Sequence, residues 1–415
     1  MYGFRKPYTV AGFEGGPLLA GLDTKTALIV AQAIGYAVSK MIGVHVVAGQ
    51  RPEQRARRIF SLIGLSWLAL VLLAMLPARF GPLCMLLNGL PLGMIWGLVF
   101  SYLEGRKSSE VLATILTSSF ILSSGVAKSV GKLLLDAGVA EPQMPALAAL
   151  AFAPLLVWGM AVLARTPPRD AMDHAMRGER APMDGAARRA YLRQNWLPLI
   201  ALVAGYTMLA ALRDLRDNFA PELWAGLGLP PTAALYSVTE VPITVLVLGG
   251  LASLALIRDN LRALLVVHGV VLAGAVVLGL SALAPAAGLM GPVGWTILSG
   301  TGIYLAYAPF SAILFDRMVA VTRSPANAGF LIYLADSFGY GGSVSLLLLR
   351  HVGSAPRDWL DLFLRASLVA AVALVMLTLI SAFWFTCQAR RGQLRPTVSP
   401  CGRPPLRPPA AAARP

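Results

Sequence analysis

The chain has 415 residues, of which 57% are hydrophobic and 13% charged, and its formal net charge is +15. A soluble domain carries roughly twice that charged fraction, so this composition and the mean hydropathy of +0.68 exclude a soluble globular protein. The basic residues cluster in alternate loops, as the positive-inside rule requires of a membrane protein, and we expect no nucleic-acid partner.

Apolar segments long enough to cross a bilayer as helices recur along the chain, without the alternation of a β-barrel. Residues 1–14 form only a partial span, which we expect to belong to a first helix completed by apolar residues before Met1. The alternative is a genuine half-helix packed against its neighbours. Full spans are expected at about 27–48, 58–76, 83–103, 110–134, 145–164, 196–216, 233–256, 262–283, 292–315, 327–349 and 360–386.

The loops divide the chain into two apolar halves joined by a basic linker. The loops on the side of the linker are rich in arginine and are expected in the cytoplasm, whereas the opposite loops hold few basic residues and include Asp217 and Glu222. The tail is rich in proline and arginine and cannot form a core. The expected domains are 1–164 (N-terminal bundle with a partial first helix), 165–194 (cytoplasmic linker), 195–388 (C-terminal bundle) and 389–415 (disordered cytoplasmic tail).

This pattern predicts an all-α integral membrane protein of the cell inner membrane, expected as a monomer. Two six-helix halves joined by a cytoplasmic linker are typical of transporters built from repeats, whose substrate binds near the midplane between the halves.

Two arginines lie inside segments that should be surrounded by hydrocarbon, one in the first segment of each half. They are Arg5 in MYGFRKPYTVAGF and Arg213 in LVAGYTMLAALRDL, and Lys40 is a third such cation. A charge at this depth is costly unless it faces a cavity, a partner or a ligand. Because a guanidinium matches the oxygens of phosphate or carboxylate, we expect Arg5, Arg213 and Lys40 to bind an anion. The alternative is that they pair with internal acids or extend to the membrane surface.

Two carboxylates, Glu240 and Asp336, also lie in apolar runs. Each is expected either to carry a proton that couples transport or to serve as the counter-ion of an arginine. Arg216, almost one turn beyond Arg213, is expected at the membrane interface. The sequence contains no HExxH, no metal-ligand spacing among its four histidines and no nucleotide-binding loop, so we expect no enzyme activity, metal or cofactor.

Several motifs resemble the major facilitator superfamily, and most closely its organophosphate:phosphate antiporter branch, which includes glycerol-3-phosphate and hexose-phosphate transporters. The similar segments are YGFRK at 2–6, GYAVSK at 35–40, LRDLRDNFAPELW at 212–224, YSVTEVP at 236–242 and FGYGGSV at 338–344. The resemblance implies that Arg5 and Arg213 bind a substrate phosphate and that Lys40 lines the cavity. Secondary candidates for the site are Tyr2, Lys6, Tyr36, Lys128, Tyr236 and Tyr340.

The chain also departs from that branch. Leu122 stands where the glycerol-3-phosphate type has a fifth-helix histidine, and Ser237 replaces an acid, with Glu240 one turn later. We therefore expect a divergent transporter that moves a small organic anion, such as a phosphate ester, by alternating access. The alternatives are a proton-coupled symporter of a carboxylate or sugar acid and a non-transporting membrane sensor with the same fold.

Overall fold

The structure is a computed structural model that describes residues 1–19, 21–48, 54–103, 109–166, 185–322, 328–350 and 358–394. Within these ranges the chain is helical, and the one β feature is an isolated bridge between Leu19 and Leu22. Nine of the helices in the described ranges are long and apolar enough to cross a membrane. The expected all-α membrane architecture is therefore confirmed.

The first half begins with two short 3₁₀ helices, η1 (Tyr2–Phe4) and η2 (Pro7–Val10). The helices that follow in this half are α1 (Thr24–Ala48), α2 (Arg55–Met75), η4 (Ala78–Phe80), α3 (Gly81–Leu103), α4 (Ser109–Asp136), α5 (Met144–Ala151) and α6 (Ala153–Ala164).

A short helix, α8 (Gly185–Gln194), precedes the second half. The helices of that half are α9 (Trp196–Asn218), α10 (Ala220–Gly226), α11 (Ala233–Ala255), α12 (Asn260–Leu283), α13 (Pro292–Pro309), the π-helical η5 (Phe310–Leu314), α14 (Phe315–Val321), α15 (Ala328–Leu349) and α16 (Trp359–Arg390).

Each full span predicted from the sequence contains a helix, with three differences in detail. The span at 145–164 is interrupted at Phe152, just before Pro154, whose missing N–H suits the first turn of a new helix. The span that begins at Pro292 continues through a π segment to Val321. Helices α8 and α10 were not predicted, because α8 is polar and α10 is short.

Residues 1–14 do not form the α-helix that we expected there. They fold into η1 and η2, in which Arg5 N–H donates to the Tyr2 carbonyl and Thr9 N–H donates to the Lys6 carbonyl, at 3.0 and 3.1 Å. Pro7 lies between the two turns and has no N–H to continue a helical ladder. The segment is nevertheless buried and packs against α4 and α5.

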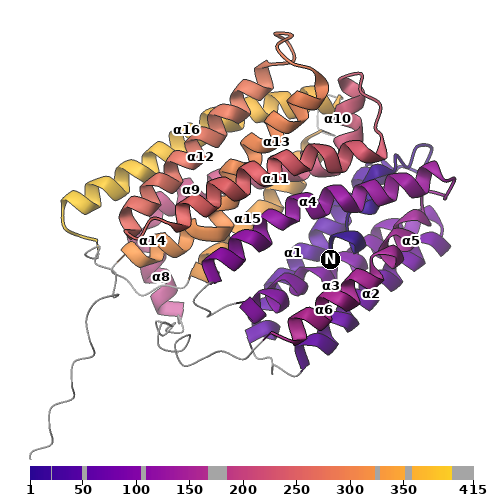
Figure 1. The fold of residues 1–415 in the computed structure, drawn as a ribbon, viewed down its shortest axis with the longest axis horizontal. Coiled ribbons are helices and arrows are strands. Elements are labelled where there is room, and N and C mark those ends of the chain that lie inside the picture. Colours follow the sequence, from indigo (N-terminus) through magenta and orange to yellow (C-terminus); the bar gives the residue numbers. More distant parts are fainter. Residues whose placement is uncertain are drawn as a thin grey trace, which may run out of the picture.

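The helices form two bundles that follow the two halves of the sequence (Figure 1). In the first half, α3 packs against both α1 and α2, and in the second half α9 packs against α15 and α16. The bundles meet where α4 lies along α11 and where α1 crosses α15. These two seams bring the charged residues of the two halves together.

Ion pairs also join the bundles near the start of α1. Lys25 lies 2.5 Å from Glu222 on α10, and Asp23 lies 3.5 Å from Arg350, the residue after α15. Both pairs connect the first half of the chain to the second. They lie at the end of the bundles that carries the loops expected outside the cytoplasm.

Candidate functional site

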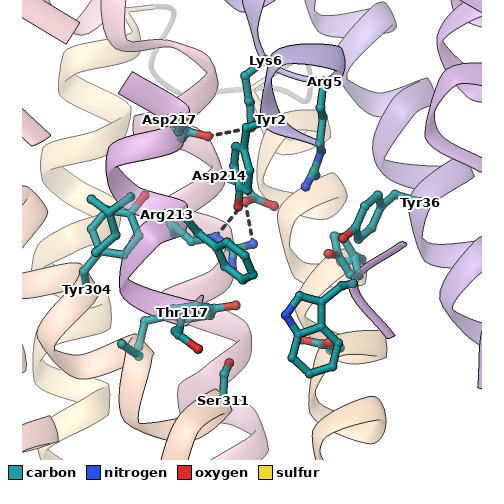
Figure 2. A pocket seen from close by; sticks show the side chains of 18 of the residues that line it. Tyr2, Arg5, Lys6, Tyr36, Thr117, Arg213, Asp214, Asp217, Tyr304 and Ser311 are labelled. Carbon is teal, nitrogen blue, oxygen red and sulfur yellow. Dashed lines mark hydrogen bonds and ion pairs between the residues drawn. The ribbon is translucent and has the colours of Figure 1, made fainter. Parts of the chain in front are cut away.

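A cavity lies between the two bundles, and eight of the eleven predicted site residues line it (Figure 2). These eight are Tyr2, Arg5, Lys6, Tyr36, Lys40, Arg213, Asp336 and Tyr340. The other three, Lys128, Tyr236 and Glu240, line a second, smaller void nearby. The cavity volume is about 80 Å³, whereas small-molecule pockets typically enclose about 300–1,000 Å³. The cavity is therefore much smaller than a typical ligand pocket.

Arg5 reaches into the cavity from the turn after η1, and its side chain forms no ion pair within the described ranges. Its guanidinium lies over the ring of Tyr36, with 4.2 Å from the central carbon to the ring centroid. The Nε atom is buried without a hydrogen-bond partner. A cation–π contact compensates only part of the cost of removing an arginine from water.

Buried side chains of three helices hold the backbone that carries Arg5. Gln32 on α1 donates to the Arg5 carbonyl at 3.3 Å and to the Asn88 side chain at 2.7 Å. Asn88 on α3 donates to the Phe4 carbonyl at 3.2 Å and to the hydroxyl of Ser66 on α2 at 2.7 Å. These bonds satisfy carbonyls that two separate 3₁₀ turns leave without helical partners.

Arg213 enters the cavity from α9 and is paired with its neighbour in sequence. Its Nε and a terminal nitrogen both donate to the same carboxylate oxygen of Asp214, at 3.0 and 2.7 Å. The other oxygen of Asp214 accepts from Ser343 at 2.8 Å. The Arg213 guanidinium lies 4.4 Å from the ring centroid of Tyr307. Figure 2 shows Arg213 and Arg5 directed into the same space from opposite bundles.

Lys40 on α1 and Asp336 on α15 form an ion pair across the seam between the bundles. Tyr206 donates to the other oxygen of Asp336, and its hydroxyl lies 2.9 Å from that of Tyr307. Tyr307 in turn lies beneath the Arg213 guanidinium. A continuous chain of contacts therefore connects the Arg213 side of the cavity to the ion pair between the bundles.

Asp217 joins the bundles on the other side of the cavity, although the sequence analysis placed it in an outer loop. It is buried at the end of α9 and forms ion pairs with both Lys6 and Lys128. Ser124 donates to it at 2.6 Å, and Lys6 also donates to Asn218 at 2.8 Å. The sequence predicts an exposed Asp217 because this residue follows an apolar run, whereas in the structure side chains of the first half of the chain cover it.

Arg216, which was expected at the membrane interface, is buried inside the protein, with only 5% of its surface exposed. It donates to Glu240 at 2.9 Å and to the carbonyl of Thr296 at 3.1 Å. Glu240 is thus the counter-ion of Arg216 and stands outside the larger cavity. Two roles were expected for Glu240, a counter-ion and a proton carrier. The ion pair with Arg216 shows the first, and the second stays a prediction.

Among the described residues, the side chains that line the cavity include four cations and three carboxylates. The ionic residues that line it are Arg5, Lys6, Lys40, Arg213, Asp214, Asp217 and Asp336. Every carboxylate in this set contacts a cation. Arg5 is the cation of this set for which the structure shows no carboxylate. The positive excess therefore falls on Arg5.

Sequence reasoning missed Asp214, Gln32 and Asn88. Asp214 stands one turn before Asp217, a spacing that places both carboxylates on one helix face, and that spacing was a usable signal. Gln32 and Asn88 are amides inside apolar spans, where a polar side chain needs a partner. The ranges that the structure describes contain no group of His, Cys, Asp and Glu arranged to hold a metal ion.

A family model described as "Family of unknown function (DUF5690)" matches residues 7–388. No curated protein matches the chain at a significant level. Among solved structures, the nucleoside transporter NupG is similar, with 13% identity and a TM-score of 0.55, over 93% of this chain and 94% of the other. A D-xylose-proton symporter has 12% identity and a TM-score of 0.54, over 90% and 94% of the two chains.

A bacterial homolog of the human lysosomal transporter Spinster, in an inward-facing and unoccupied conformation, is also similar. It has 13% identity and a TM-score of 0.55, over 94% of each chain. Identities this low establish the fold alone. The chain therefore has the major-facilitator fold, in which two helical bundles enclose a central cavity.

Proposed function

We propose, from the premise that the chain belongs to the DUF5690 family and has the major-facilitator fold, that it is a secondary active transporter of a small organic anion. The observation that carries the proposal is Arg5, a buried cation in the central cavity without a carboxylate partner in the described ranges. A buried charge without a counter-charge is unfavourable. An anionic substrate supplies the missing counter-charge.

Arg5 and Arg213 would bind the anion together, each from one bundle. Arg5 offers its unpaired guanidinium, and Arg213 has one terminal nitrogen that makes no bond to Asp214. An anion held by both would draw the two bundles together around it, as alternating access requires. A guanidinium fork recognises two oxygens at once, which favours a head group such as phosphate or carboxylate. A phosphate ester is the substrate that the resemblance to the organophosphate antiporters favours.

Aromatic rings form much of the remaining surface of the cavity. The rings that line it belong to Tyr2, Tyr36, Trp96, Phe120, Tyr304, Tyr307 and Tyr340. Such a lining contacts the body of a substrate while the arginines hold its charge. Lys40 would line the path of the anion, with Asp336 as its counter-ion in the empty protein.

Transport is coupled either to the exchange of a counter-anion or to a proton on Glu240 or Asp336. The second possibility is the proton-coupled symport of a carboxylate or sugar acid, and a buried carboxylate in each seam favours it.

We further propose that the protein is a monomer of the inner membrane, with bundles 1–164 and 195–388 and with the linker 165–194 and the tail 389–415 in the cytoplasm.

The test is flux through vesicles that contain the purified full-length protein. Vesicles loaded with phosphate esters, organic acids or sugar acids, one class at a time, are presented with the radiolabelled compound outside. We expect counterflow for at least one anionic class and none for the neutral parent sugars. Binding without flux for every class would instead indicate a sensor, and uptake of neutral sugars alone would refute the anion proposal.

A further inference from the structure

Four carboxylates pair with cations in or beside the central cavity, namely Asp214, Asp217, Glu240 and Asp336. Of these four, Glu240 is the one with an oxygen that has no partner. Arg216 donates to Oε1, whereas Oε2 is buried without any hydrogen bond. Both oxygens of Asp214 and both oxygens of Asp336 accept hydrogen bonds or ion pairs. The same holds for Asp217. An unpartnered carboxylate oxygen in a dry interior is costly. A proton on this oxygen would neutralise the charge, and the resulting O–H would need an acceptor such as a water molecule.

The void beside Glu240 provides the space through which a proton can arrive. Its volume is about 10 Å³, close to the volume that one water molecule needs. Two further buried polar atoms from its lining also lack partners, the hydroxyl of Tyr236 and Nε of Arg216. A single water there can donate to Glu240 Oε2 and accept from Tyr236 or Arg216. These three polar groups, Glu240 Oε2, the Tyr236 hydroxyl and Arg216 Nε, match the roughly three hydrogen bonds that a buried water molecule makes.

Lys128 connects this void to the central cavity. It lines the void and donates to Asp217 at 2.6 Å, and Asp217 lines the cavity. Glu240 also lies at the seam between the bundles, because a Cβ on Gly125 of α4 would come within 3.0 Å of its Cγ. The charged and titratable groups around Glu240 are Arg216 and Asp217 on α9, Lys128 on α4, Tyr236 on α11 and Tyr304 on α13.

We infer that Glu240 is the proton-binding site of this transporter, reached from the cavity through one water in the void. In the step, the water receives a proton from the cavity side and passes a proton to Oε2, so the water itself is unchanged. The carboxylate becomes a neutral acid. Arg216 then loses its counter-charge, and the positive charge around the cavity rises by one. Proton binding therefore strengthens anion binding, and the two move together.

This inference rests on the proposed function, since it assigns the coupling ion of the same transporter. It also distinguishes between the two carboxylates that could carry the proton. Asp336 contacts Lys40 through one carboxylate oxygen and Tyr206 through the other, so both of its oxygens have partners. Glu240 has a free oxygen and a water-sized void beside it.

The first experiment needs no substrate. Infrared difference spectra of the purified protein are recorded as the pH is lowered from about 9 to about 5, a range that lies above the ordinary pKa values of aspartate and glutamate side chains in water. We expect the carbonyl band of a protonated carboxyl group to rise in the wild type and to be absent in Glu240→Gln. A band that is unchanged in Glu240→Gln, or no such band in the wild type, overturns the inference.

The second experiment measures sulfate binding as a function of pH, because sulfate stays a dianion throughout that range. In the wild type, sulfate affinity is expected to fall as the pH rises, by up to about tenfold per pH unit, as for a site linked to one proton. Glu240→Gln mimics the neutral acid and is expected to bind sulfate tightly at every pH. A Glu240→Gln protein with the pH dependence of the wild type contradicts the inference.

Glu222→Gln is the matched control, since Glu222 also pairs through one oxygen and leaves the other, Oε2, unpartnered. It lies outside both the cavity and the void, so its pH dependence should be that of the wild type. If the pH dependence is lost in Glu222→Gln as well, the assignment to Glu240 is wrong. Failure of the wild type to bind sulfate at any pH would count against the anion site itself, and the infrared result would still decide the role of Glu240.

Discussion

Arg5 is positioned through its backbone, since no carboxylate holds its side chain in the described ranges. The carbonyls of Phe4 and Arg5 accept from Asn88 and Gln32, which bond to each other. A guanidinium fixed in this way can meet a ligand without first breaking an ion pair. Arg213 is different, because its guanidinium already forms an ion pair with Asp214.

We predict that Asn88→Leu weakens anion binding about five- to tenfold, because it leaves the Phe4 carbonyl buried without a donor and releases the segment that carries Arg5. The measurement is a double-mutant cycle of sulfate affinity with Arg5→Lys. If Asn88 acts through Arg5, then Asn88→Leu has little further effect in the Arg5→Lys protein.

Ser381→Ala is the control for this cycle. It removes a buried hydroxyl that bonds His268 at 2.9 Å, in a helix pair away from the cavity lining. We expect it to lower thermal stability slightly and to leave sulfate affinity as in the wild type. An equal loss of affinity from Asn88→Leu with and without Arg5 would mean that Asn88 serves only the fold.

The sequence was sufficient to locate the cations of the site but not their partners. Arg5, Lys40 and Arg213 stand out because a charge in an apolar run has few structural explanations. The pairing of Lys40 with Asp336, across almost three hundred positions, depends on how α1 and α15 cross. The way in which two helices cross cannot be predicted from a single sequence.

At the scale of elements, the full spans were predicted well because their length and hydropathy are imposed by the bilayer. The errors fall at features that length and hydropathy do not determine. Helix α10 has only seven residues, and the start of the chain forms 3₁₀ turns around Pro7. Neither feature is set by hydropathy, and both depend on contacts with other helices.

The crossing of α1 and α3 depends on glycines that allow the two backbones to touch. A Cβ on Gly35 of α1 would collide with the carbonyl oxygen of Leu86 on α3, and one on Gly89 would collide with that of Gln32. Close approach through small residues is the usual way in which membrane helices associate. The crossing also places Gln32 within reach of Asn88.

We predict that Gly35→Ala destabilises the protein by about 1–3 kcal/mol, the usual cost of overpacking. The loss should appear as a lower melting temperature of the purified protein in detergent. Gly64→Ala on α2 is the control, because a Cβ there meets nothing within 4 Å, and it should leave the melting temperature unchanged or raise it. Equal melting temperatures for the two variants would contradict the packing argument.

For the whole molecule, the two bundles are tied at both sides of the cavity by ion pairs. Lys6 and Lys128 reach Asp217 on one side, and Lys40 reaches Asp336 on the other. Each of these pairs has its cation in the first half and its carboxylate in the second. Relative motion of the bundles must exchange these partners, and an anion in the cavity is a competing partner for the same cations.

We predict that the linker and the tail lie on the same side of the membrane, in the cytoplasm, because both are strongly basic. Residues 167–184 and 395–415 lie outside the described residues. A phosphatase that is active only outside the membrane, fused at Asp184 or after Pro415, should give no activity. Activity from either fusion would require a different number of spans.

The central claim is that Arg5 and Arg213 together bind an anion in the cavity between the bundles. The most direct test is the sulfate affinity of Arg5→Lys and Arg213→Lys, because lysine keeps the charge but loses the planar fork. Losing one charge-assisted hydrogen bond costs about 1.5–3 kcal/mol, which corresponds to roughly ten- to a hundredfold in affinity. Arg365→Lys, at an exposed ion pair on α16, is the control and should bind as the wild type does. The account predicts a loss of this size in both cavity variants while they insert and purify normally, and unchanged affinity in either well-folded variant would contradict it.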